Sequence, residues 1–275
     1  MKKITVLKGK TVYLFGGSSG IGLEMAKQMA AEGAHVMVYA RTEINLDKAL
    51  AEIKKVRLTA SVRVEKMPVD VTDREGIRTV IEESIRNFGV PDILINCAGR
   101  AYPATFEDIS YEQFDETMRV NLYGIWNTCA AALPYMKKSG GWILNTSSMA
   151  GFLGVYGYTD YAASKYAIVG FSEALRSEIE SAGIGVSVLC PPDTDTPGFE
   201  TENQTKPPET RAICGGAKIM TPADVARICI KELKQGKKMI IPGFDGKLTY
   251  FLKSHFPFIV ELLIKRLIKK SSHNP

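Results

Sequence analysis

The stretch that decides the fold reads Thr11-Val-Tyr-Leu-Phe15, then Gly16-Gly-Ser-Ser-Gly20-Ile-Gly22, then Leu23-Glu-Met-Ala-Lys-Gln-Met-Ala30. The short apolar run predicts a buried strand, the glycines predict a tight turn, and the apolar spacing that follows predicts a helix. In this order the free N–H groups and positive dipole of the helix N-terminus face the turn, which favours an anionic ligand such as a pyrophosphate. A glycine-rich turn can also serve only to allow positive φ, so binding depends on the wider pattern.

Six further apolar runs predict strands, and segments of helical length and period lie between them: 35–39, 63–68, 93–96, 141–146, 185–189 and 239–241. The repeated β-α-β order predicts an α/β fold, a single-domain, Rossmann-like, doubly wound parallel sheet with helices on both faces. Ligands of such sheets bind at the carboxyl ends of the strands. The motifs described below all lie at such ends or on the helices that follow them.

Composition limits the domain organisation and the compartment. The chain has 275 residues, 45% of them hydrophobic, and no linker-like tract, so we expect one main domain over 1–246, with a loop at 191–218, and an extension over 247–275. The five cysteines are widely spread and never at metal-ligand spacing, which indicates a reducing compartment and no structural metal. The apolar run near Met1 is too short for a signal peptide or a membrane span. We therefore expect a cytoplasmic protein.

The net charge of +5 is concentrated at the C-terminal end. Residues 247–275 hold six basic side chains and one acidic side chain, which leaves the rest of the chain balanced. A nucleic-acid-binding surface requires clustered Lys and Arg on the folded domain. The sequence therefore predicts no nucleic-acid partner.

The glycine spacing, Gly16-x-x-x-Gly20-x-Gly22, resembles that of the short-chain dehydrogenase/reductase superfamily over roughly residues 8–245. Three further segments match: Asp70-Val71, Asn96-Cys97-Ala98-Gly99, and Asn121 within Val120–Gly124. Phe15 departs from the usual Thr of that family, and Cys97 departs from its second Asn. The resemblance implies a nicotinamide dinucleotide held by Gly16, Ser18, Ser19, Gly20, Ile21, Gly22, Asp70, Val71, Asn96, Ala98 and Gly99.

The end of the second predicted strand indicates which dinucleotide is used. An NAD site usually presents an acidic residue to the ribose there, but this strand ends in Val38-Tyr39-Ala40-Arg41. Arg41 can form charge-assisted hydrogen bonds to a 2′-phosphate, with the hydroxyls of Ser18 and Ser19 nearby. The sequence favours NADP(H); the alternative is that Arg41 is only a solvated surface charge.

Tyr161 and Lys165 stand four residues apart in a helical stretch and so share one helix face. A phenol has a reference pKa of about 10, and an adjacent ammonium favours its ionised form. We expect Lys165 to lower the pKa of Tyr161 while it binds the nicotinamide ribose. Tyr161 then gives a proton to a carbonyl oxygen as hydride arrives at the carbon.

Two more residues complete the catalytic set that the resemblance implies. Ser148 follows a predicted strand, thirteen positions before Tyr161, and would orient and polarise the substrate oxygen. Ser147 is the neighbouring alternative, but the spacing favours Ser148. Asn121 would hold a water that links Lys165 to solvent.

The loop after the sixth predicted strand, from Cys190 to Arg211, resembles that of 3-ketodihydrosphingosine reductases, which reduce a long-chain 2-amino-3-ketone with NADPH. Within it Pro191, Thr194 and Thr196 are candidate cofactor contacts. Asp193 or Asp195 could meet a substrate ammonium; the alternative is that they cap the following helix. A loop rich in Pro, Thr and Gly can close over substrate and nicotinamide.

The segment from Leu248 to Lys270 predicts an amphipathic helix, or a pair of helices broken near Pro257. A basic helix that carries aromatic residues can lie in the headgroup region of a membrane, which would place the protein on its cytoplasmic face. The alternatives are packing over the substrate pocket or against another subunit. Related reductases form dimers or tetramers, and we expect a homo-oligomer.

These observations favour NADPH-dependent reduction of a long-chain lipid ketone such as 3-ketodihydrosphingosine to a secondary alcohol. The nearest alternative is a short-chain carbonyl reductase or alcohol dehydrogenase that acts on a steroid, acyl or small ketone. A second alternative is a non-catalytic NADP-sensing or membrane-binding protein on the same scaffold.

Overall fold

A seven-stranded parallel sheet forms the centre of the computed structural model, which describes residues 4–216 and 218–272. The strands run in the order β3-β2-β1-β4-β5-β6-β7, so the chain winds outward in both directions from β1. Their bounds are β1 Thr11–Phe15, β2 His35–Ala40, β3 Val64–Pro68, β4 Ile93–Asn96, β5 Gly141–Thr146, β6 Ile184–Leu189 and β7 Met239–Ile240. The predicted doubly wound sheet is confirmed, with single-residue differences at the ends of β2, β3, β6 and β7.

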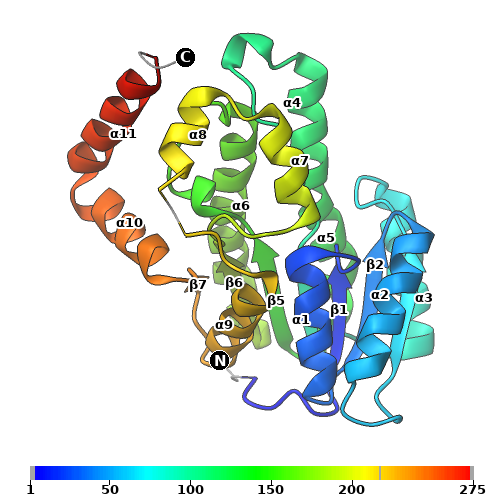
Figure 1. The fold of residues 1–275 in the computed structure, drawn as a ribbon. Helices are drawn as coiled ribbons and strands as arrows, with labels where there is room; N and C mark the ends of the chain where they lie inside the picture. The colour runs from blue at the N-terminus through cyan, green and yellow to red at the C-terminus, as the bar shows by residue number, and fades with distance from the viewer. Residues whose placement is uncertain (1–3, 217, 273–275) are drawn as a thin grey trace.

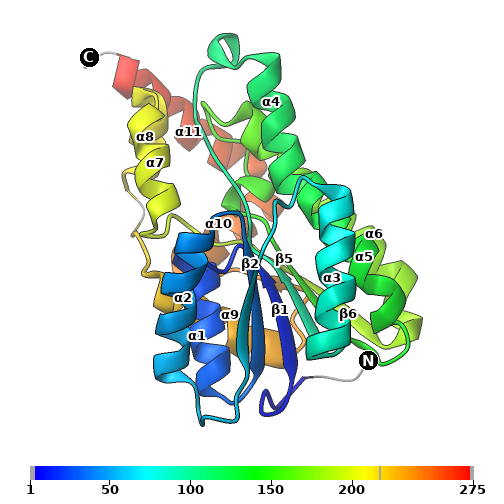
Figure 2. The same ribbon diagram turned by 90° about the vertical axis from the view of Figure 1, so that its right-hand side faces the viewer.

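Helices cover both faces of the sheet (Figures 1 and 2). Alternate residues of β1 show why: Val12 and Leu14 pack in one apolar cluster, whereas Tyr13 and Phe15 pack in another. The first cluster is closed by α1 (Gly20–Ala31), α2 (Glu43–Val56) and α9 (Pro222–Lys234). The second is closed by α3 (Arg74–Phe88), α5 (Gly124–Met136) and α6 (Thr159–Ile179), with α4 (Tyr111–Met118) leading into α5.

The strand register aligns the carboxyl ends of the central strands. Phe15 pairs with Asn96, Asn96 pairs with Asn145, and Thr146 pairs with Leu189. The segments that follow β1, β4, β5 and β6 therefore leave the sheet side by side. This edge is where a doubly wound fold binds its ligand.

The chain after β6 forms two short helices above this edge, α7 (Pro197–Thr205) and α8 (Pro208–Cys214). The last segment forms α10 (Phe244–His255) and α11 (Pro257–Ser272), with the predicted break at Pro257. The expected boundary at 246/247 falls inside α10, and α11 packs against α8. Val260 of α11 is buried in a cluster with Phe152, so the extension is packed onto the main body.

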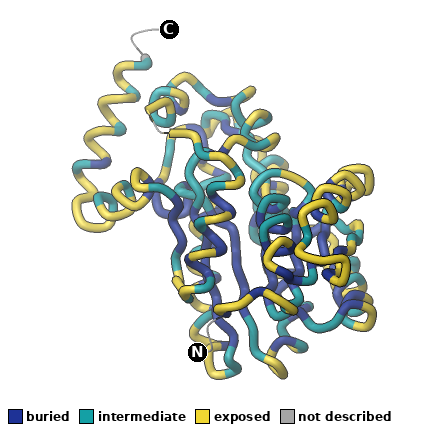
Figure 3. The backbone as a smooth tube through the Cα atoms, turned by 60° about the horizontal axis from the view of Figure 1, so that its bottom comes forward, coloured by how far each residue is buried: buried dark blue, intermediate teal, exposed yellow. Residues whose placement is uncertain are grey.

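Most of the α11 surface nevertheless faces solvent (Figure 3). Within the described residues, no helix has the length and apolar character needed to cross a bilayer.

Candidate active site

The glycine-rich turn lies against the loop that follows β4. Gly16 has φ +80°, and an added Cβ there would collide with the backbone of Ala98. Gly20, the first residue of α1, has φ +54°, and its Cβ would lie 3.0 Å from the methyl carbon of Thr196. The glycines therefore permit both the left-handed backbone and the close approach of the loop after β6.

The N-terminus of α1 presents unpaired donors at this turn. Ser19 is the N-cap residue, but its side chain makes no capping hydrogen bond, and no acidic residue lies in the first helical turn. The N–H of Gly22 contacts the Cys97 thiol, whereas the N–H groups of Gly20 and Ile21 have no side-chain acceptor among the described residues. This donor set fits a pyrophosphate, whose charge also suits the helix dipole.

Arg41 follows β2 directly beside the glycine-rich turn, because the N–H groups of Gly16 and Gly17 both donate to the carbonyl of Tyr39, at 2.9 and 3.4 Å. Arg41 is exposed, and no other described residue pairs with its guanidinium. The hydroxyls of Ser18 and Ser19 likewise have no partner among the described residues. An unpaired guanidinium and two free hydroxyls suit a 2′-phosphate.

Tyr161 lies in the first turn of α6 and faces the serine that follows β5. Burial raises the pKa of its phenol above the usual value, Glu202 raises the pKa further, and interaction with the Ser148 hydroxyl lowers it in part. Tyr161 is therefore protonated at neutral pH, which is the form that gives up a proton. Ser147, by contrast, is buried and donates to the carbonyl of Lys165 at 2.8 Å, so the geometry favours Ser148 as the substrate-facing serine.

Lys165 lies below Tyr161 on the same helix face, with its Nζ atom 5.4 Å from the centroid of the Tyr161 ring. Nζ donates to the carbonyl of Thr146 at 3.1 Å, and burial lowers the pKa of Lys165 to about 8. The expectation that the pKa of Tyr161 lies below its usual value is wrong, because the pKa is raised and any favourable effect of Lys165 is outweighed. Burial and the Glu202 carboxylate dominate the pKa of Tyr161, and Lys165 is directed toward the end of β5.

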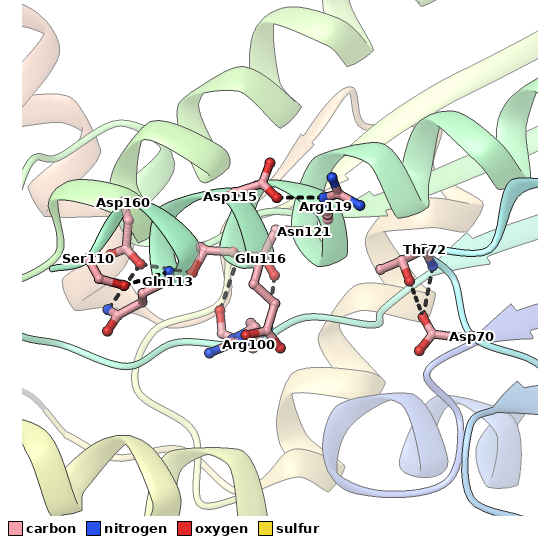
Figure 4. A network of polar contacts seen from close by, with 11 residues as sticks. Asp70, Thr72, Arg100, Ser110, Gln113, Asp115, Glu116, Arg119, Asn121 and Asp160 are labelled. Atoms are coloured by element: carbon pink, nitrogen blue, oxygen red, sulfur yellow. Dashed lines mark hydrogen bonds and ion pairs between the residues drawn. The ribbon is translucent and has the colours of Figure 1, made fainter.

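Asn121 lies in a π-helical turn, Arg119–Tyr123, between α4 and α5. Its side chain accepts a hydrogen bond from the Arg100 N–H at 2.8 Å and donates to the Arg100 carbonyl at 3.0 Å (Figure 4). It also donates to Ser164 Oγ at 2.9 Å. A wide turn of this kind turns a side chain inward and is frequent at functional sites. Asn121 thus holds the loop after β4, and its Oδ1 atom keeps one free acceptor position.

Gly99 separates Asn121 from Lys165. A Cβ on Gly99 would lie 3.3 Å from Oδ1 of Asn121 and 3.5 Å from Nζ of Lys165. Any side chain there would fill the space that both polar groups border. The residues at this point therefore fit a bound ribose beside Lys165.

Asp160 is a site residue that the sequence reasoning missed. It is 1% exposed, and its carboxylate accepts from the Tyr161 N–H at 2.7 Å and from Thr117 Oγ1 at 2.8 Å. Gln113 adds a longer contact at 3.4 Å, so helix α4 is joined to the start of α6 (Figure 4). Asp160 fixes the turn that carries Tyr161. An acidic residue in a first helical turn was the available signal.

Two predicted cofactor residues, Asn96 and Asp70, have side chains that already form hydrogen bonds within the protein. The amide of Asn96 donates to Asn145 Oδ1 at 2.8 Å and accepts from Thr128 Oγ1 at 2.7 Å, inside the core. The carboxylate of Asp70 accepts from the N–H and hydroxyl of Thr72, both at 2.8 Å (Figure 4). Val71 and Ala98, together with Phe15, border one small hollow at the ends of the strands. These residues shape the loops around the site; Asp70 and Ala98 are half-buried, and the others are buried.

The loop after β6 uses its predicted residues in different ways. The Pro191 carbonyl accepts from the Met149 N–H at 3.2 Å, and the buried Thr194 hydroxyl donates to the Pro192 carbonyl at 2.7 Å. Thr196 is the N-cap of α7 and accepts from the Phe199 N–H at 3.1 Å. The alternative in which Asp193 or Asp195 caps this helix is therefore wrong, because Thr196 occupies the position.

Two further residues belong to the site and were not predicted: Glu202 in α7, and Lys206 directly after this helix. Glu202 accepts a short hydrogen bond from the hydroxyl of Tyr158, whose ring centroid lies 5.5 Å from that of Tyr161. Lys206, 3% exposed at its side chain, pairs with Glu202 at 2.9 Å and with Asp193 at 3.9 Å. The Glu202–Lys206 pair has the i,i+4 spacing that the sequence could have signalled. The contacts with Tyr158 and Asp193 have no local signal, because they form only when α7 folds over Tyr158. No metal-binding group of three His, Cys, Asp or Glu side chains occurs in the described ranges.

Comparison with known proteins agrees with this arrangement. The family model described as short chain dehydrogenase matches residues 10–207. A 3-ketodihydrosphingosine reductase of Bos taurus is 39% identical over 254 residues, which cover 92% of this chain and 76% of that protein. A 3-dehydrosphinganine reductase of Danio rerio is 38% identical over 242 residues, which cover 87% of this chain and 73% of that protein.

Solved structures share the fold. A short-chain dehydrogenase from Novosphingobium aromaticivorans superposes with a TM-score of 0.78 at 28% identity, covering 94% of this chain and 88% of that one. The L-sorbose reductase of Gluconobacter frateurii, solved with NADPH and L-sorbose, superposes with a TM-score of 0.74 at 24% identity, covering 86% of this chain and 96% of that one.

Proposed function

Because this chain belongs to the short-chain dehydrogenase family, we propose that it reduces a long-chain 2-amino-3-ketone, 3-ketodihydrosphingosine, to the secondary alcohol with NADPH. It is an oxidoreductase that acts on a C=O/CH–OH pair and uses a nicotinamide cofactor. The observation that carries the proposal is the protonated phenol of Tyr161 beside Ser148, in a chain whose relatives, matched over most of its length, are named as reductases of this ketone.

The cofactor supplies a hydride to the carbonyl carbon. The chain supplies the proton and the geometry: Ser148 donates a hydrogen bond to the carbonyl oxygen, which is thereby polarised and held against Tyr161. Tyr161 then transfers its phenolic proton to that oxygen as negative charge develops on it. Lys165, still largely protonated at neutral pH, stabilises the tyrosinate that remains.

Arg41 supports NADPH over NADH as the reductant. An unpaired guanidinium beside the glycine-rich turn adds charge-assisted hydrogen bonds only when the ribose bears a 2′-phosphate. The residues that would hold the rest of the cofactor are the glycine-rich turn, Gly99, Lys165 and Thr196.

A substrate panel tests this function. With NADPH, we expect kcat/KM for the long-chain 2-amino-3-ketone to exceed that for short ketones and steroids, since the chain-bearing substrate buries more apolar surface. Efficient turnover of short ketones with no turnover of the long amino ketone would contradict the proposed substrate and leave the reductase class standing.

We also propose that the C-terminal helices dock on the anionic cytoplasmic face of a membrane, where a lipid ketone partitions. On α11 the side chains of Phe258, Leu262 and Leu263 are 66%, 49% and 48% exposed, next to the basic Lys265 and Arg266. Exposed apolar and basic side chains on one helix suit the headgroup region of such a membrane. The inner side of α11 meanwhile packs on α8, so docking need not unfold the extension.

Vesicle flotation tests the docking surface. We expect wild-type protein to float with phosphatidylcholine vesicles that contain phosphatidylserine, and Phe258→Glu to float much less. Phe106→Glu is the matched control, because Phe106 is 74% exposed but lies away from α11, in the short 3-10 helix Phe106–Asp108 before α4. Equal flotation of wild type and Phe258→Glu would contradict membrane docking.

We also propose a homo-oligomer that forms through the surface of α5 and α6. Tyr123, Trp126 and Tyr166 are 52%, 58% and 44% exposed on the π-helical turn, α5 and α6, more aromatic surface than a solvated face needs. We expect light scattering to give a dimer or tetramer for wild type and a smaller species for Trp126→Glu. A wild-type monomer at micromolar concentration would contradict this proposal.

A further inference from the structure

A group of charged side chains next to Tyr161 is not accounted for by proton transfer. It consists of Asp193 from the loop after β6, Glu202 from α7 and Lys206 just after α7, with the hydroxyl of Tyr158. Their side chains are 29%, 15% and 3% exposed for Asp193, Glu202 and Lys206. Two carboxylates and one ammonium leave this enclosed group with one negative charge in excess.

The two carboxylates are not equally satisfied. Glu202 accepts from the Tyr158 hydroxyl and pairs with Lys206 at 2.9 Å. The carboxylate of Asp193 accepts no hydrogen bond from any described residue, and its ion pair with Lys206 is loose at 3.9 Å. The excess charge is therefore on Asp193, whose oxygens have free acceptor positions.

Apart from its loose pair with Lys206, Asp193 has no cationic partner among the described residues. The guanidinium of Arg211 is used by the backbone, donating to the carbonyls of Lys206 at 3.0 Å and Asn203 at 2.5 Å. The Cys214 thiol lies within the electrostatic influence of Asp193 but stays neutral, because burial raises its pKa to about 11. A half-buried carboxylate without donors is costly to keep unless a ligand supplies them.

Asp193 lies close to the reacting atoms. Lys206 pairs with both Asp193 and Glu202, Glu202 accepts from the Tyr158 hydroxyl, and the Tyr158 ring centroid lies 5.5 Å from that of Tyr161. In keeping with this, the charges of Glu202 and Asp193 help to raise the pKa of Tyr161. In a 2-amino-3-ketone the ammonium nitrogen is attached to the carbon next to the carbonyl, so a carbonyl held by Ser148 and Tyr161 places the ammonium within the same small region. A carboxylate with free acceptor positions is the group that such an ammonium would meet.

We propose that Asp193 binds the 2-ammonium group of the substrate and is the residue that selects amino ketones, with Glu202, Lys206 and Tyr158 holding Asp193's surroundings in place. The inference rests on the proposed function and deepens it. It assigns the role to Asp193 and not to Asp195, which is exposed on the same loop. Selection arises because a ketone without the ammonium leaves the Asp193 carboxylate uncompensated.

A pair of substrates that differ only in the amine tests this role. We expect wild type to reduce the long-chain 2-amino-3-ketone with a higher kcat/KM than the desamino ketone of equal chain length. Asp193→Asn, which keeps the shape and removes the charge, should lower kcat/KM for the amino ketone by about 10- to 100-fold and leave the desamino ketone unchanged or improved. Asp195→Asn is the matched control and should change neither value.

Several results would overturn the inference. A fall of equal size on both substrates would show a merely structural role for Asp193, and no fall on the amino ketone would remove its role altogether. A thermal midpoint and an NADPH Kd within error of wild type guard against misfolding of Asp193→Asn. If wild type reduces both ketones equally, amino selection is wrong while the reductase function stands; if wild type reduces neither, the proposed function itself fails.

Discussion

The Nζ atom of Lys165 donates a hydrogen bond of 3.1 Å to the main-chain carbonyl of Thr146, the last residue of β5. This contact joins helix α6 to the strand end from which Ser148 emerges. The contact therefore holds α6 and the end of β5 together at the base of the site. Because Lys165 is only 4% exposed, its charge depends on what else lies in the site.

NADPH affinity should depend on the charge of Lys165. Burial lowers the pKa of Lys165 to about 8, so the ammonium is present at pH 7 and is lost as pH rises through 8. The protonated form binds the anionic cofactor better, and the NADPH Kd should therefore rise by about tenfold between pH 7 and pH 9.5. A fluorescence titration at each pH measures this, and in Lys165→Met the inflection near pH 8 should disappear. An identical inflection in the variant would assign it to another group.

Arg41 should control the choice of cofactor. Arg41→Ala removes a charge-assisted contact to the 2′-phosphate, worth roughly 1.5–3 kcal/mol, so kcat/KM for NADPH should fall by about 10- to 100-fold. The value for NADH should stay within a factor of about two, because NADH has no group for Arg41 to bind. The control is Lys48→Ala, an exposed cation on α2. Equal losses with both cofactors would mean that Arg41 acts through the fold.

Asp160 should act as a positioning residue for Tyr161. Asp160→Ala leaves the Tyr161 N–H and the Thr117 hydroxyl without their acceptor, and we expect the free energy of unfolding to fall by about 1–3 kcal/mol. Misplacement of the phenol should also lower kcat by about tenfold or more while the NADPH Kd stays unchanged. Asp115→Ala is the control, because its pair with Arg119 is exposed and is worth at most about 1 kcal/mol. An unaltered kcat at reduced stability would limit Asp160 to a structural role.

Much of the fold was predictable because its signals are local. Each strand is a short apolar run between turns, and Pro257 marks the break between α10 and α11. The pairing of Tyr161 with Lys165 on one face follows from helix geometry alone. Thr196 as N-cap was also readable, because it stands directly before a proline at the first helical position.

The parts of the site that the sequence did not reveal depend on contacts between distant segments. Glu202 meets Tyr158 across 44 positions, and Asp160 meets Thr117 across 43. The pKa of Tyr161 was expected to be lowered by its helical neighbour Lys165, but burial and the Glu202 carboxylate raise it. Burial and the charges of distant residues are properties of the folded chain, so they cannot be predicted from the spacing of residues in the sequence.

The direct test of the central claim is the formation of the amino diol from 3-ketodihydrosphingosine and NADPH by wild type and by Tyr161→Phe, followed by mass spectrometry. Loss of the proton donor should reduce kcat by about 10²- to 10⁴-fold while NADPH still binds. Tyr166→Phe, five residues along the same helix and 44% exposed, should retain full activity. Product formation by Tyr161→Phe at a rate close to that of wild type would contradict the account.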